Sequence, residues 1–180
     1  MDQLISAGVQ IVVLSLPAAV FAWRRRSSDA RKVLGLTLGK PTDYWLAVVV
    51  TALVGAVSLL ATRSIPADVL AAAGSANRIT SLAAGAAVLL RATSEELLFR
   101  GFLQGVIGAR FGRSVGVWTQ AVLFLLPHLL LLALSPLLWP LLPAQFLAGL
   151  CLGWLRSRHD SIAPPILAHG VTNLLAGLTI

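Results

Sequence analysis

The feature that most constrains this chain is a series of long apolar segments separated by short basic ones. The first covers residues 3–23, about the 20 residues that an α-helix needs to cross a bilayer. Further apolar segments cover 44–62, 115–134 and a run that ends at 155. Only 12% of the residues are charged, against about 25% in a soluble domain, and the mean hydropathy is +0.86. The sequence therefore predicts an all-α, multi-pass membrane protein.

Two more helices are predicted at 79–109 and 164–180, which brings the expected number of membrane-spanning helices to six. Charged residues interrupt the helix at 79–109, so it is expected to be surrounded by protein or to line a watery cavity. We expect the chain to divide into two N-terminal helices with their loops, residues 1–78, and a four-helix catalytic core, residues 79–180.

The basic residues predict how the helices are oriented. Alternate connecting segments hold ten of them: Arg24, Arg25, Arg26, Arg31, Lys32, Lys40, Arg110, Arg113, Arg156 and Arg158. The other connecting segments hold only Arg63 and Arg78. Cytoplasmic loops carry the excess of Lys and Arg, so both termini are expected outside a cell membrane. This topology accounts for the net charge of +7 without a nucleic-acid partner, and it leaves His159, in a basic turn, solvated.

Segment 93–101 places Glu95, Glu96 and Arg100 near the middle of the predicted helix at 79–109. A charge at the bilayer centre costs about 2.5–3.5 kcal/mol on insertion scales, so these groups need partners. Glu96 and Arg100 are four residues apart and can pair on one helix face. Glu95 points about 100° away from Glu96 and is therefore freer for chemistry. Arg91, four residues before Glu95, can also pair with it and weaken it as a base.

Polar residues on three predicted helices lie at similar depths in the membrane. Counted from the cytoplasmic ends at about 1.5 Å per residue, Glu95 and His128 both lie about 22 Å deep. His169 and Asn173 lie about 15 and 21 Å deep by the same rise. A carboxylate, two imidazoles and an amide are thus predicted to meet in one layer.

Three patterns follow one another on successive predicted helices: Glu95-Glu96-x-x-x-Arg100, Phe124-x-x-x-His128 and His169-x-x-x-Asn173. As an ordered set they resemble the CAAX prenyl protease and bacteriocin-processing family (CPBP, also called Abi), whose members are intramembrane glutamic endopeptidases. The resemblance covers about residues 80–180, so the first two helices lie outside it.

The resemblance implies that Glu95 and His128 hold and activate a water, while His169 and Asn173 form the oxyanion site. These residue types suit the chemistry, because carboxylates and imidazoles act as general bases and imidazole and amide N–H groups stabilise an oxyanion. The implied reaction is hydrolysis of a peptide bond in or near the bilayer. The implied partners are membrane lipid and a peptide or protein substrate.

The resemblance implies supporting roles for the other motif residues. Glu96 and Arg100 would stabilise the site, and Phe124 would form a wall of its cavity. No cofactor is implied.

Two other functions are compatible with the sequence. In a zinc-dependent protease, His128, His169 and Glu95 would be the metal ligands. However, no His-Glu-x-x-His pair presents two ligands on one helix. A non-enzymatic membrane partner or a bacteriocin-immunity protein could share the fold. Because every motif residue is present, the enzyme is the favoured interpretation.

Overall fold

The computed structural model describes residues 2–25, 28–74 and 78–179, which form helices with no strand among them. The long helices are α1 (Asp2–Arg25), α3 (Asp43–Arg63), α7 (Arg113–His128), α9 (Leu141–His159) and α10 (Ala163–Thr179). The short ones are α2 (Ser28–Leu34), α4 (Ala67–Gly74), α8 (Leu131–Leu134) and the 3-10 helix η3 (Pro136–Leu138). A further long helix is continuous through α5 (Leu82–Glu96), the π-helical η2 (Leu97–Leu103) and α6 (Gln104–Phe111). The predicted all-α class is confirmed.

Four of the described helical segments are long and apolar enough to cross a membrane: Asp2–Arg25, Asp43–Arg63, Arg113–Leu134 and Pro136–His159. They correspond to the four apolar segments that the sequence predicts as spans, so the chain is a membrane protein. The segments predicted at 79–109 and 164–180 are helical from Leu82 and as far as Thr179, but neither is among these four. Ile180 lies outside the described residues. The total of six spans, the four-helix core and the division at residue 78 therefore stay predictions.

The span predicted at 115–134 is built from two helical pieces. α7 ends at His128, where the N–H groups of Leu129 and Leu130 bond to carbonyls three residues back. Such bonds tighten the last turn of a helix. The chain then continues into α8, and residues 135–143, which hold three prolines, contain η3 and the start of α9. This break leaves His128 at a helix end, beside the leucines of the following turn.

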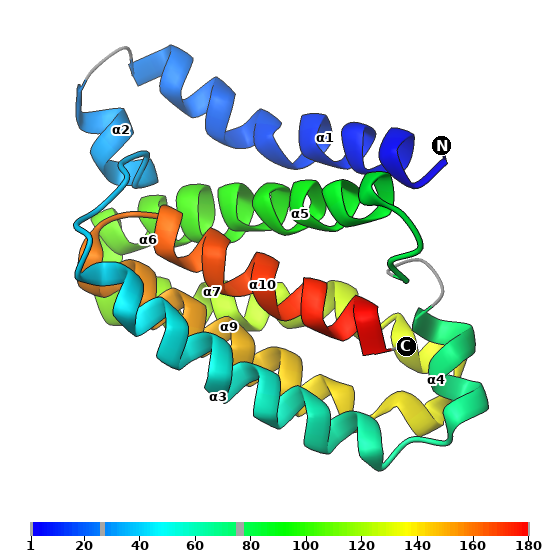
Figure 1. The fold of residues 1–180 in the computed structure, drawn as a ribbon. Coiled ribbons are helices and arrows are strands. Elements are labelled where there is room, and N and C mark those ends of the chain that lie inside the picture. The colour runs from blue at the N-terminus through cyan, green and yellow to red at the C-terminus, as the bar shows by residue number, and fades with distance from the viewer. Residues whose placement is uncertain (1, 26–27, 75–77, 180) are drawn as a thin grey trace.

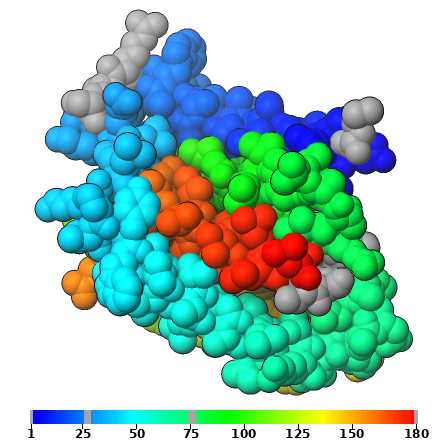
Figure 2. All heavy atoms as spheres, viewed as in Figure 1, coloured from blue at the N-terminus to red at the C-terminus, as the bar shows by residue number. Residues whose placement is uncertain are grey.

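The long helices pack side by side in a closed arrangement (Figure 1). α5 packs against α10, α10 against α3, α3 against α9, and α9 against α7. α7 returns to η2 and α6, the continuation of α5. α1 lies outside this arrangement, along α5 and η2, and the space-filling view shows it along one edge of the molecule (Figure 2).

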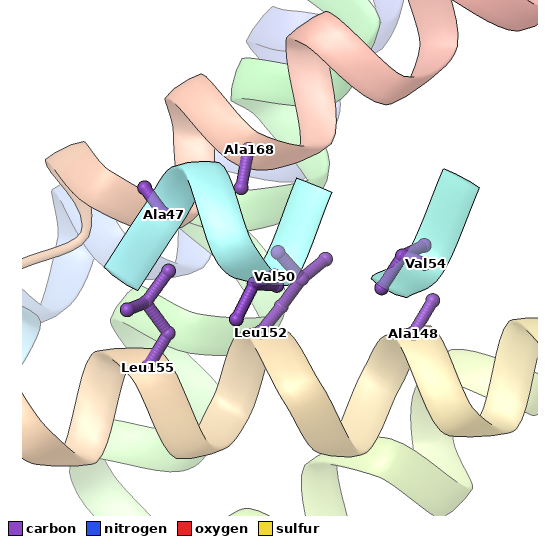
Figure 3. Close-up of a cluster of buried hydrophobic side chains, with 7 residues drawn as sticks. All are labelled: Ala47, Val50, Val54, Ala148, Leu152, Leu155 and Ala168. Atoms are coloured by element: carbon purple, nitrogen blue, oxygen red, sulfur yellow. The ribbon is translucent and has the colours of Figure 1, made fainter. Parts of the chain in front are cut away.

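Small residues let these helices approach closely. Ala47, Val50 and Val54 of α3 meet α9 and α10 in an apolar cluster (Figure 3). The remaining members of the cluster are Ala148, Leu152, Leu155 and Ala168. Gly149 and Gly153, four residues apart on α9, form a face of close packing, because a Cβ on Gly149 would lie 3.2 Å from Cα of Ala121. Close backbone approach of this kind stabilises helix pairs in a bilayer.

The described basic residues of the three predicted cytoplasmic segments gather at one end of the bundle, where α1, α6 and α9 end and α2 and α7 begin. Arg26 lies outside the described residues. Which side of the membrane this end faces stays a prediction.

The expectation that His159 is solvated is wrong. Its side chain is 15% exposed, and its Nδ1 lies 2.9 Å from Oδ1 of the buried Asp43. The buried carboxylate at the start of α3 needs a partner, and the end of α9 supplies one.

Candidate functional site

A fully buried ion pair forms the base of the candidate site. Nη1 of Arg100 donates to Oε1 of Glu96 at 2.6 Å, and neither side chain is exposed. The same oxygen lies 2.7 Å from Nδ1 of His169 on α10. A carboxylate oxygen accepts only, so Nδ1 carries the proton of this contact. Glu96 therefore joins α5 to α10 as well as pairing along its own helix.

Phe124 lies at the centre of the cluster and is 1% exposed. Cζ of Arg100 lies 4.4 Å from the centroid of its ring, a cation–π distance. The centroids of the Phe99, His128 and His169 rings lie 5.1, 4.9 and 6.0 Å away. The Phe124 ring therefore orients both histidines and covers the buried guanidinium.

Glu95 differs from its neighbour in both direction and exposure. Its side chain is 24% exposed, whereas that of Glu96 is buried. Oε1 of Glu95 accepts from Nε2 of Gln10 on α1 at 3.2 Å, and Oε2 lies 3.8 Å from Nε2 of His169. The rotation of about 100° between adjacent helical residues explains why the two carboxylates face different surroundings.

A cavity of about 510 Å³ opens beside Glu95. Glu95 and His128 line it from α5 and α7, and Phe124 and Phe99 contribute aromatic walls. The other lining residues are Gln10, Leu14, Leu98, Pro127, Leu130, Leu131 and Leu134. Two proton-transfer groups therefore face an apolar space large enough for part of a peptide, as in most ligand sites.

His128 is held by its own helix. Nδ1 lies 2.8 Å from the carbonyl oxygen of Phe124, one turn earlier. A carbonyl accepts, so Nδ1 donates and a neutral ring keeps Nε2 as an acceptor. His128 thus has the tautomer that a general base needs.

Asn173 and Arg91 lie at the margins of the cluster. Asn173 is half-buried one turn after His169, and no hydrogen bond joins it to the other predicted site residues within the described ranges. Nη2 of Arg91 donates to the backbone carbonyl of Gln3 on α1 at 3.4 Å. Arg91 therefore contributes to the packing of α1 on α5.

The alternative zinc ligands, Glu95, His128 and His169, do not form a metal-binding group. Across residues 2–25, 28–74 and 78–179, no three His, Cys, Asp or Glu side chains are placed to hold a metal ion.

Two features of the site were missed by sequence reasoning. Gln10 lies on a helix that was placed outside the site, although it is the one amide within the apolar run 4–23. The π-helical turn η2 follows directly after Glu96, and π-helical turns often occur at functional sites. An amide inside an apolar segment is the signal that could have identified Gln10, whereas no sequence pattern predicts η2.

The family model described as Rce1-like, type II CAAX prenyl endopeptidase, matches residues 77–175. The match covers more than half of the chain and includes every residue of the three motifs, whereas α1 to α4 lie outside it. No curated protein and no solved structure matches the chain.

Proposed function

The chain belongs to the Rce1-like family of type II CAAX prenyl endopeptidases, and from this premise we propose an intramembrane endopeptidase whose water is activated by Glu95 and His128. Membership of the family implies a membrane protease that acts on peptide substrates. The observation that carries the finer proposal is the cavity, because a carboxylate and an imidazole from different helices line the same apolar space.

In the proposed reaction, a water molecule binds between the Glu95 carboxylate and Nε2 of His128. The Glu95 carboxylate removes a proton from this water as the water oxygen attacks the carbonyl carbon of the peptide bond, and Nε2 of His128 accepts a hydrogen bond from the same water. The same proton is then delivered to the leaving nitrogen as the C–N bond breaks, so the enzyme returns to its starting state. The hydrogen bond from Nδ1 of His128 to Phe124 supports this role, because it keeps the acceptor nitrogen available.

The proposed oxyanion site uses His169 and Asn173. The contact with Glu96 places a proton on Nδ1 of His169, so a doubly protonated ring also presents Nε2–H as a donor. Nε2 of this ring lies 3.8 Å from Oε2 of Glu95, so it faces the proposed water site. Asn173 follows one turn later on the same face and contributes an amide N–H. Donors held in a low-dielectric site stabilise a developing oxyanion more strongly than donors in water.

Glu96, Arg100 and Phe124 act by positioning. The pair Glu96–Arg100 anchors His169, and the Phe124 ring contacts both histidines. Their buried contacts support this assignment, because catalytic side chains act efficiently only when their neighbours hold them in a fixed orientation.

The decisive experiment substitutes Glu95→Gln, which keeps the shape of the side chain and removes the base. The N-termini of membrane proteins are compared between cells that express wild type or the variant at equal levels. We expect N-termini that depend on wild type and fall about 100-fold or more in the variant, the usual contribution of a general base. Asp68→Asn, the same chemical change on the exposed α4, is the matched control and is expected to cleave normally.

Three outcomes would contradict the proposal. Full cleavage by Glu95→Gln would remove Glu95 from the reaction. Identical N-termini with both proteins folded would favour the non-enzymatic partner. Loss of wild-type cleavage on treatment with a metal chelator, restored by zinc, would favour the zinc protease. We expect cleavage to persist in chelator.

A further inference from the structure

The helix α1 lies outside the segment matched by the family model, yet it completes the candidate site. Gln10 and Leu14 line the cavity from α1, one turn apart on the same face of that helix. Ala7 and Ala18 continue this face and are buried. Neighbouring side chains on the other faces, such as Val9 and Val12, are 59% and 66% exposed. α1 therefore forms a wall of the cavity with one buried face, whose half-buried amide lines the cavity, while its other faces expose apolar side chains.

Three contacts hold α1 in register with the motif helix. The backbone carbonyl of Gln3 accepts from Arg91, Gln10 donates to Glu95, and the ring of Phe21 packs edge-on against Phe102 at 6.1 Å. These contacts run in the same order along both helices, so α1 lies parallel to α5 and η2. The contact of Gln10 with Glu95 is thus the middle one of three contacts in an extended interface between the two helices.

We propose that Gln10 is a positioning residue for Glu95, an inference that rests on the proposed function. Nε2 of Gln10 donates to Oε1 of Glu95 at 3.2 Å, while Oε2 faces His169. The terminal torsion of a glutamate is broad and roughly two-fold, so a carboxylate without a directed donor rotates among many orientations. The amide of Gln10 restricts this rotation and thereby sets the orientation of Oε2, the oxygen left to accept a proton from the proposed water.

The chemistry of the residue agrees with this role. A glutamine amide on a membrane helix needs a partner, because an unsatisfied polar group in an apolar environment is costly. A carboxylate accepts only, so it takes the N–H side of the amide. The amide adds a donor to Glu95 without adding a charge or a second base to the cavity.

The experiment measures kcat and KM for Gln10→Met and Gln10→Glu. The probe is a fluorogenic peptide that spans a cleavage site found in the comparison of N-termini. Met keeps the length of the side chain and removes the donor, while Glu replaces the donor with a second carboxylate. We expect kcat to fall about tenfold in Gln10→Met, the order for a lost hydrogen bond to a charged group, and further in Gln10→Glu. KM and the folded yield are expected to stay at wild-type values.

A matched control and a double variant separate this role from a packing role. Val9→Met introduces the same residue at the neighbouring, exposed position of α1 and is expected to keep wild-type kcat. In a Glu95→Gln background, Gln10→Met is expected to cause no further loss, because it acts through Glu95. Wild-type kcat in Gln10→Met, or an equal loss in Val9→Met, would overturn the proposal.

A readout that needs no substrate distinguishes failure of this proposal from failure of the proposed function. The rate at which dicyclohexylcarbodiimide, a carboxyl reagent that enters membranes, labels Glu95 is measured by mass spectrometry. We expect faster labelling in Gln10→Met than in Val9→Met, because the carboxylate is no longer held. Equal labelling overturns the role of Gln10 even where Glu95→Gln is inactive. Faster labelling with an active Glu95→Gln variant overturns only the function of Glu95.

Discussion

Two Arg–carboxylate pairs among the described residues, Glu96–Arg100 and Arg156–Asp160, share a spacing of four residues and have opposite surroundings. Glu96 and Arg100 lie 2.6 Å apart, and neither side chain is exposed. Arg156 and Asp160 lie 3.4 Å apart at the basic end, where the arginine is 6% exposed and the aspartate 65%. Identical spacing along the chain therefore produces one pair that is closed to solvent and one that is open on its acidic side.

The two arginines also differ in what else they contact. Arg100 lies against the Phe124 ring, and its carboxylate partner is shared with His169. Arg156 donates from Nη2 to the backbone carbonyls of Val33 and Lys32 at 3.1 and 3.4 Å. The first pair thus organises side chains of the candidate site, whereas the second fastens α2 to the end of α9. A spacing of four residues on a helix therefore predicts that an arginine and a carboxylate form an ion pair. The burial of the pair decides whether it orders other side chains of a site or fastens one helix to another.

The largest effect on stability is expected from breaking the closed pair. Arg100→Ala leaves the Glu96 carboxylate buried without its main partner, and removal of one member of a buried pair costs about 3–5 kcal/mol. Glu96→Gln leaves the Arg100 charge buried and is expected to cost about 3 kcal/mol by the same argument. Thermal unfolding of the purified protein and its folded yield measure both. A loss no greater than that of the open pair would contradict the comparison.

A smaller effect is expected from Arg156→Ala. This change removes the donor that Arg156 supplies to the Val33 carbonyl of α2 and to Oδ1 of Asp160. Arg113 still donates to Oδ2 of Asp160, and an unsatisfied group costs about 1–3 kcal/mol. Because Asp160 can turn to water, the loss is expected to be smaller than for Arg100→Ala. Hydrogen exchange is expected to increase in α2 and to stay unchanged around Glu96. Uniform destabilisation of the whole bundle would show that the basic end is not a separate unit.

The smallest effect is expected from Arg113→Ala. Arg113 contacts the other oxygen of Asp160 at 3.1 Å, but both side chains are about two-thirds exposed. Exposed pairs contribute about 0–1 kcal/mol and weaken in salt. Thermal unfolding at low and high salt is expected to differ little from wild type. A loss as large as that of Arg156→Ala would mean that Arg113 holds Asp160 in place for Arg156.

The fold was predictable where the pattern is local. Apolar segments of membrane-spanning length predicted the helices, because backbone groups in a bilayer must be satisfied within a segment. The spacing of Glu96 and Arg100 predicted their pairing, and the adjacent position of Glu95 predicted its different direction. The prediction failed at His159, because a basic turn looks solvated until the start of α3 brings Asp43 against it.

Contacts between distant segments were not predictable in the same way. Residues 10 and 95 are 85 positions apart, and residues 96 and 169 are 73 apart. Helical periodicity states which face a residue occupies, but not which helix that face meets. The packing of α2 on α6 shows the same limit. The two helices approach so closely at Gly105 that a Cβ there would lie 2.1 Å from the carbonyl oxygen of Val33, and no local pattern predicts this contact.

The sequence by itself determined that the chain is an all-helical membrane protein, which residues carry its motifs, and how each is turned on its own helix. These follow from hydropathy and from the helical repeat, which act over a few residues. Only the tertiary structure decided that His169 meets Glu96, that Gln10 meets Glu95, and that the break after His128 shapes a cavity beside them. These depend on the packing of whole helices, where close-fitting small residues select one arrangement among many that the same periodicities allow.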